Sequence, residues 1–100
     1  MTDAFDLKTA AALGADAAQL LESRIFTDVW KALEDKYAAG WLSSRLEDQQ
    51  HREHIFRLRL NMAALRSEID GLVNAGKAAS AELAMQERAA TVRQMNRIPA

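Results

Sequence analysis

The sequence contains no cysteine, and its single proline is Pro99. Without cysteine the chain can form neither a disulfide framework nor a thiolate metal site, and this agrees with a reducing compartment. Proline and glycine interrupt helices, and only four glycines occur in 100 residues. These absences favour a chain made largely of helices, and the alanine enrichment near both ends adds to that tendency.

The sequence also lacks a long hydrophobic run. No segment approaches the roughly 18 apolar residues that a membrane span needs. The first six residues are acidic and contain no apolar stretch of the kind found in signal peptides. We therefore expect a cytoplasmic protein without a membrane partner.

Net charge is low, at −1, but it is unevenly distributed. Residues 1–44 hold seven acids and four bases, whereas residues 77–100 hold two acids and four bases. This gradient is too small to indicate nucleic-acid binding by itself. A chain of this length forms one domain with a thin core, so a partner subunit is a natural source of further burial.

Glycine and cap residues predict where the helices begin and end. Gly14 is expected to stop a short first helix, and Asp16 to cap a second one. Ser44 and Glu47 fit a capping box that starts a helix near Arg45, and Gly76 is expected to end it.

The predicted fold is all-α. It consists of an antiparallel helical hairpin of residues 25–42 and 45–75, because the short connection between them favours antiparallel neighbours. Short helices within residues 1–24 precede the hairpin, and a loosely held C-terminal helix within residues 77–100 follows it. We expect all of these helices to belong to a single domain.

The first hairpin helix carries an aromatic stripe with spacings of 4, 3, 4 and 4. Its members are Phe26, Trp30, Leu33, Tyr37 and Trp41. This periodicity is typical of an amphipathic helix, so we expect the stripe to form the hairpin core. The alternative is a platform on which nucleic-acid bases stack.

The second hairpin helix carries two apolar stripes. The first, the heptad stripe, has spacings of 3, 4, 3, 4 and 3. Its members are Ile55, Leu58, Met62, Leu65, Ile69 and Leu72. The second, made of Phe56, Leu60 and Ala63, runs beside it, so this helix has more apolar surface than one neighbour can cover. The predicted protein interface comprises Ile55, Phe56, Leu58, Leu60, Met62, Leu65, Ile69 and Leu72. The heptad stripe could face only the hairpin partner, or could also form a homo-oligomeric coiled coil, which we favour.

Motifs for catalysis are absent. The sequence has no glycine-rich phosphate loop and no nucleophile paired with a base, so we predict no catalytic residues and no cofactor. His51 and His54, with Glu47 one turn earlier, could ligate a metal ion. Their spacing differs from that of zinc proteases, and we predict a solvated helix turn instead of a metal site.

Nucleic-acid contact is an alternative function for the arginines. One group consists of Arg52, Arg57, Arg59 and Arg66, but it is interleaved with acids, which indicates a mixed solvated face. Arg88, Arg93 and Arg97 are better candidates for phosphate contacts, because acids become rare there.

The middle of the chain, residues 20–83, resembles a group of short helical proteins of tailed bacteriophages and prophages. The shared positions are Leu20-Leu21, Phe26, Trp30, Leu33-Glu34, Trp41, Ser44, Asp48, Arg52-Glu53, Leu65 and Gly76-Lys77. At Ser23-Arg24 the sequence departs from the group, which more often has Asn-Pro at the start of that helix.

The resemblance implies a non-enzymatic phage protein that self-associates and docks on a larger assembly during virion assembly or DNA packaging. Its expected location is then the host cytoplasm or the virion. One alternative is a nucleic-acid-binding factor like a small terminase subunit, although the acidic N-terminal region offers no basic recognition helix. Another is a phage inhibitor of a host protein.

Overall fold

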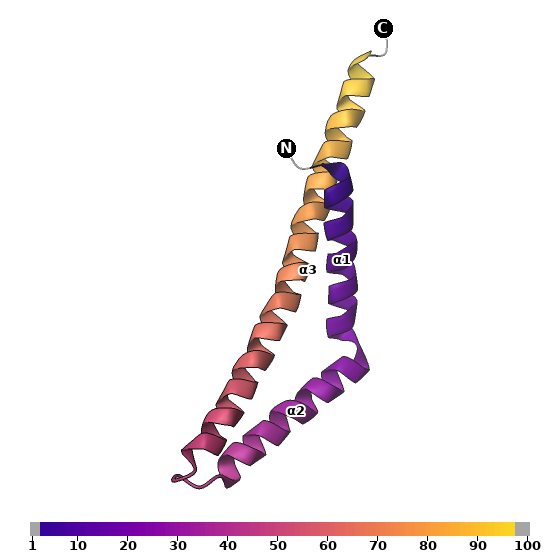
Figure 1. The fold of residues 1–100 in the computed structure, drawn as a ribbon. Helices are drawn as coiled ribbons and strands as arrows, with labels where there is room; N and C mark the ends of the chain where they lie inside the picture. The colour runs from indigo at the N-terminus through magenta and orange to yellow at the C-terminus, as the bar shows by residue number, and fades with distance from the viewer. Residues whose placement is uncertain (1–2, 98–100) are drawn as a thin grey trace. The chain divides into compact units, whose positions relative to one another are not determined.

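The described residues, 3–97 in the computed structural model, form three α-helices (Figure 1). They are α1 (Ala4–Glu22), α2 (Arg24–Ser43) and α3 (Gln49–Arg97). No β-strand occurs in this range, so the predicted all-α class is confirmed. The last three residues of the predicted C-terminal helix lie outside the described range.

The chain divides into two compact units. Unit 1 combines the first part of α1 with α3 from Gly71 onward, and unit 2 spans Ala18–Asp70. The expectation that all helices belong to a single domain stays a prediction.

Unit 2 contains the helical hairpin. Here α2 and the first part of α3 lie antiparallel, side by side, and residues 44–48 connect them (Figure 1). All five members of the aromatic stripe of α2 are half-buried, and the rings of Phe26 and Trp30 stack at 5.5 Å. Near the connection the helices approach closely, since a Cβ on Gly40 would lie 3.2 Å from Ile55 Cδ1.

Ser23 alone separates α1 from α2. Its backbone N–H donates to the Leu20 carbonyl at 3.1 Å, and its hydroxyl accepts from the backbone N–H of Phe26 at 3.4 Å. Serine is a favoured N-cap because its side chain satisfies a free N–H of the first helical turn. The same residue thus ends one helix and begins the next.

Ser44 ends α2 and does not begin α3. Both its backbone N–H, at 3.2 Å, and its hydroxyl, at 2.6 Å, donate to the Trp41 carbonyl. The N-cap of α3 is Asp48, whose carboxylate accepts from the backbone N–H of His51 at 3.1 Å. The predicted capping box of Ser44 and Glu47 was therefore wrong, because a later carboxylate satisfies the free N–H groups of the helix.

We expect Asp48→Ala to lower the free energy of unfolding by about 1 kcal/mol, as losing an N-cap usually does. Glu47→Ala is the matched control and should change it by less than about 0.5 kcal/mol, the usual range for surface substitutions. Thermal unfolding followed by circular dichroism at low protein concentration measures both. Equal losses for the two variants would contradict the assignment of the cap.

In unit 1, α1 and α3 lie antiparallel and their backbones touch. A Cβ on Gly14 would lie 2.6 Å from the Cα of Gly76 and 2.8 Å from the Leu72 carbonyl oxygen. The prediction that Gly14 and Gly76 stop helices was wrong, because both lie inside helices and are buried. Their missing side chains permit the close approach. Because neither glycine ends a helix, α1 is one helix where two short ones were predicted, and α3 continues to Arg97.

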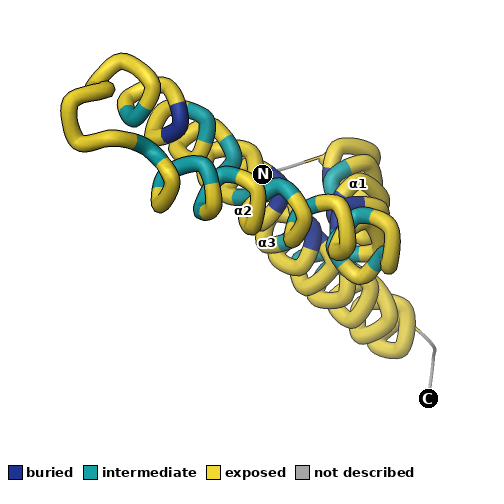
Figure 2. The backbone as a smooth tube through the Cα atoms, turned by 90° about the horizontal axis from the view of Figure 1, so that it is seen from below, coloured by how far each residue is buried: buried dark blue, intermediate teal, exposed yellow. Residues whose placement is uncertain are grey.

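The core of each unit is thin. Five hydrophobic residues are buried, and no described side chain is fully buried; the five are Leu7, Ala17, Ile55, Ile69 and Ala79. Most of the backbone is exposed, and the buried positions lie where helices meet (Figure 2). A protein of this size normally gains its stability from apolar burial, so uncovered apolar surface is costly here.

Candidate protein-interaction surface

The heptad stripe predicted for α3 faces inward only in part. Ile55 and Ile69 are buried, and Leu58 and Met62 are half-buried. Leu65 is 53% exposed.

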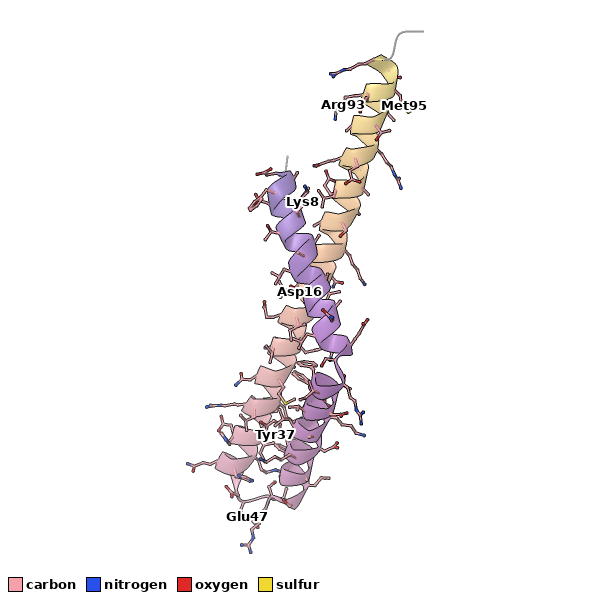
Figure 3. The ribbon with its side chains drawn as sticks, turned by 90° about the vertical axis from the view of Figure 1, so that its right-hand side faces the viewer. Lys8, Asp16, Tyr37, Glu47, Arg93 and Met95 are labelled. Atoms are coloured by element: carbon pink, nitrogen blue, oxygen red, sulfur yellow. The ribbon has the colours of Figure 1, made fainter. Side chains whose placement is uncertain are left out.

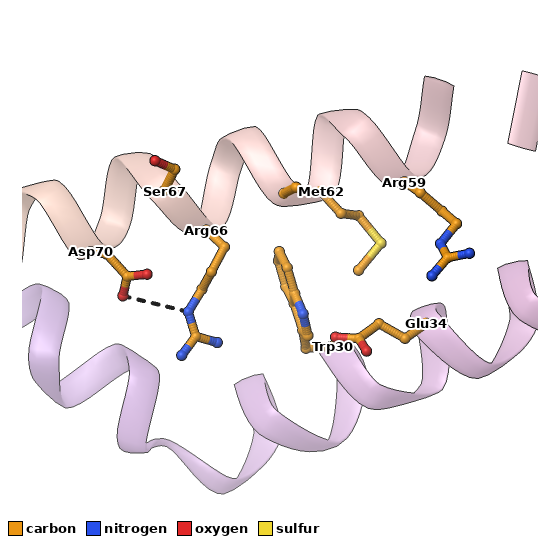
Figure 4. Close-up of a pocket in the computed structure, with 8 residues that line it drawn as sticks. Trp30, Glu34, Arg59, Met62, Arg66, Ser67 and Asp70 are labelled. Atoms are coloured by element: carbon orange, nitrogen blue, oxygen red, sulfur yellow. Dashed lines mark ion pairs between the residues drawn. The ribbon is translucent and has the colours of Figure 1, made fainter. Parts of the chain in front are cut away.

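After Met62 the inward face continues with other residues. Leu72, like Leu65, is exposed, and the inward positions belong to Arg66 and Val73. The inward residue that follows Met62 is Arg66, four positions later along the helix. Figure 4 shows the reason: the ring of Trp30 stands between Met62 and Arg66. Leu65 and Leu72 therefore do not lie on the inward face of α3, and their place in the predicted protein interface stays a prediction.

A second stripe of α3 runs along the edge of this inward face, within unit 2, and shares Arg66 with it. Its members recur at steps of 4, 3, 4, 3 and 4, and we call them the flank stripe: Arg52, Phe56, Arg59, Ala63, Arg66 and Asp70. Phe56 is 54% exposed, and the neighbouring Leu60 is 52% exposed. Unit 2 therefore leaves apolar surface uncovered on this side, as the sequence predicted for Phe56 and Leu60.

Two hollows lie along the flank stripe, between α2 and α3. The first has a volume of about 420 Å³, and Trp30, Glu34 and Arg59 are among its lining residues. The second, of about 370 Å³, lies nearer the connection and is lined in part by Trp41, Leu46 and Phe56. Both combine apolar walls with charged rims, which suits the side chains of a docking helix.

Charges in the first hollow are only loosely paired. Arg66 Nε lies 3.6 Å from an Asp70 carboxylate oxygen, which is beyond normal hydrogen-bond length (Figure 4). Glu34 and Arg59 extend from opposite walls toward the hollow, and no ion pair joins them. This arrangement leaves charged groups free to bind a partner.

Three arginines of the flank stripe, Arg52, Arg59 and Arg66, recur every seven residues, or about 10.5 Å along the helix. The Arg52 guanidinium lies over the Trp41 ring, 4.2 Å from its centroid. The Nε atoms of Arg52 and Arg66 are buried and have no hydrogen-bond partner. The stripe therefore offers a regular row of guanidinium groups, a geometry that suits carboxylates.

Sequence reasoning missed this row. The interleaved acids suggested a mixed face, and Arg57 was grouped with the other arginines. In the structure Arg57 lies elsewhere on the helix and forms an ion pair with Glu53 at 2.8 Å. The seven-residue spacing of Arg52, Arg59 and Arg66 was the signal that could have separated them from Arg57.

The two histidines are exposed on the first turns of α3. Over residues 3–97 no group of three or more histidine, aspartate or glutamate side chains is close enough to hold a metal ion. His51 and His54 therefore contribute to no ligand cluster in the described part of the chain.

The arginines predicted to contact nucleic acid belong to unit 1, on the exposed final turns of α3 (Figure 3). Arg93 and Arg97 are one turn apart and share a face. Arg88 precedes Arg93 by five residues, which places it about 140° around the helix axis. The helix thus does not bring the three into one basic patch.

No helix within residues 3–97 combines the length and the apolar composition that a membrane crossing requires. Comparison of the chain with family models, with curated proteins and with solved structures finds no match.

Proposed function

We propose that this chain is a non-enzymatic interaction protein that self-associates through the side of unit 2 carrying the flank stripe and Leu60. The observation that carries the proposal is the half exposure of Phe56 and Leu60 beside two hollows, in a chain with few buried residues. Full burial of a large apolar side chain contributes roughly 1.5–3 kcal/mol. Covering both side chains would therefore add a substantial fraction of the stability of a small domain.

Self-association is tested by size-exclusion chromatography with light scattering across a range of concentrations. We expect a mass above 11.1 kDa that increases with concentration. A strict monomer at high micromolar concentration would overturn the proposal.

The double substitution Phe56→Ser with Leu60→Ser is expected to weaken association about tenfold or more, because it removes apolar surface from the interface. Met85→Ser is the matched control, since Met85 is similarly exposed but belongs to unit 1. Sedimentation velocity of each variant measures the change. If Met85→Ser weakened association as much as the double substitution did, the self-association surface would not be confined to the side of unit 2 that carries the flank stripe and Leu60.

The resemblance of residues 20–83 to short bacteriophage proteins supports a role for this association in virion assembly or DNA packaging. Genes for head and terminase proteins beside this gene would support that role, whereas a neighbourhood of host-takeover genes would favour an inhibitor of a host protein. The nucleic-acid alternative depends on Arg88, Arg93 and Arg97, which do not share one face. We therefore favour a protein partner.

A further inference from the structure

The face of α2 that points away from α3 carries a regular pattern of its own. Its members recur at steps of 3, 4, 3, 4 and 3, and we call them the outer stripe: Ile25, Asp28, Ala32, Asp35, Ala39 and Leu42. All six are exposed, with Ile25 at 74% and Leu42 at 83%. A heptad pattern on a helix face indicates packing against another helix, and unit 2 provides none here.

We propose that the outer stripe of one copy docks antiparallel on the flank stripe of a second copy. This inference rests on the proposed self-association and names the surfaces that meet. The outer stripe has carboxylates seven residues apart, at Asp28 and Asp35, and the flank stripe has guanidinium groups at the same interval. Equal spacing lets two carboxylates meet two guanidinium groups in a single register.

That register also matches side-chain size. When Asp35 faces Arg59 of the second copy, Ala32 faces Ala63 and Ala39 faces Phe56. A small residue thus lies opposite each apolar member of the flank stripe, which allows close helix packing. Apolar and charged layers alternate in the middle of the contact, whereas at its ends Leu42 faces Arg52 and Ile25 faces Asp70.

The same register joins two existing ion pairs into one cluster. Within each copy Arg24 lies 3.7 Å from Asp28, and Arg66 lies 3.6 Å from Asp70. In the antiparallel arrangement Arg24 faces the second copy's Asp70 while Asp28 faces its Arg66, so all four charges alternate in sign. Such loosely held exposed pairs contribute little alone and gain strength when an interface excludes water.

Docking adds most electrostatic attraction at Asp35 and Arg59, which face each other in this register. Both are exposed, and neither forms an ion pair within the described residues. Glu34 lines the same hollow and would repel an incoming carboxylate, whereas the guanidinium row attracts it. Within this hollow Arg59 and Arg66 equal the acids Glu34 and Asp70 in number, and Asp70 already lies beside Arg66, so the attraction for an incoming carboxylate is centred on Arg59.

Because the outer and the flank stripes are different surfaces, each copy can contact one neighbour through its outer stripe and another neighbour through its flank stripe. Such a heterologous contact generates a closed ring if the rotation between copies closes, and a filament if it does not. The contact therefore predicts assemblies larger than a dimer.

Charge reversal in the full-length chain tests this contact. Asp35→Arg and Arg59→Asp should each weaken association about tenfold, because each places like charges opposite one another. Combining them should restore association to within about threefold of the parent, since the pair is rebuilt with reversed sign. The control is Asp35→Arg with Arg57→Asp, which should not restore it. Circular dichroism verifies that each variant is helical.

The outcomes separate the two proposals. An oligomeric parent whose association is unchanged by the single reversals, or unrestored by the combined one, would overturn this contact and leave self-association standing. A monomeric parent would overturn both.

Cross-linking provides a second measurement that does not depend on charge. The chain has no native cysteine, so Ala32→Cys and Ala63→Cys variants each carry one thiol. Oxidising a mixture of the two should give the mixed disulfide as the main product, because a disulfide requires Cβ atoms about 4 Å apart. Ala64→Cys, pointing elsewhere on α3, should give little mixed disulfide with Ala32→Cys. Equal yields from both mixtures would contradict the register.

Discussion

Replacing Gly14 by alanine is expected to lower the free energy of unfolding by about 2 kcal/mol. The added Cβ would lie 2.6 Å from the Cα of Gly76, a backbone atom that cannot move without separating α1 from α3. Overpacking of this kind costs about 1–3 kcal/mol or more. The higher helix propensity of alanine would return at most about 1 kcal/mol. Gly76→Ala meets the Gly14 Cα at 2.7 Å and should behave in the same way.

Gly71→Ala is the matched control in the same helix. A Cβ at Gly71 meets nothing within 4 Å, so alanine gains helix propensity without a clash. The variant should be more stable than the parent by up to about 1 kcal/mol. Thermal unfolding at one low concentration compares the three variants. A stabilising effect of Gly14→Ala would show that the helices of unit 1 do not touch there.

Ile55→Ala should lower the free energy of unfolding by about 3 kcal/mol, the second large effect. Ile55 is 5% exposed and packs close to Gly40 of α2, so truncation leaves a cavity between the helices of unit 2. Truncating a buried isoleucine typically costs 2–5 kcal/mol, partly through lost burial and partly through the cavity. Chemical unfolding of dilute protein, where association is negligible, measures this loss.

Leu60→Ala is the companion variant, because Leu60 lies on the exposed side of the same helix. In dilute solution it should change the free energy of unfolding by less than about 1 kcal/mol. At high concentration it should weaken association, which Ile55→Ala does not do directly. If both variants destabilised the dilute protein equally, Leu60 would belong to the core of unit 2 and not to the interaction surface.

Much of unit 2 could be predicted from the sequence. The aromatic stripe of α2 fixes which face is buried, because residues three and four apart share one side of a helix. The excess apolar surface at Phe56 and Leu60 was likewise visible as a second stripe. Local periodicity suffices for such features, since it depends only on helix geometry.

The helix ends were harder to predict. Gly14 and Gly76 were assigned to helix ends because glycine readily adopts the left-handed conformation that ends helices. In this chain no described glycine has a positive φ, and these two serve close packing. Sequence alone does not distinguish the two uses of glycine, since the difference lies in a helix more than fifty residues away.

By itself the sequence determined that this chain is helical, that α2 turns its aromatic stripe inward and that α3 has more apolar surface than one helix covers. Only the tertiary structure decided which glycines let helices touch. It also decided that Arg66, and not Leu65, follows Met62 on the inward face of α3. The physical reason is that helix periodicity is a property of one segment. The choice between a step of three and a step of four depends on the side chain that the neighbouring helix inserts, here Trp30.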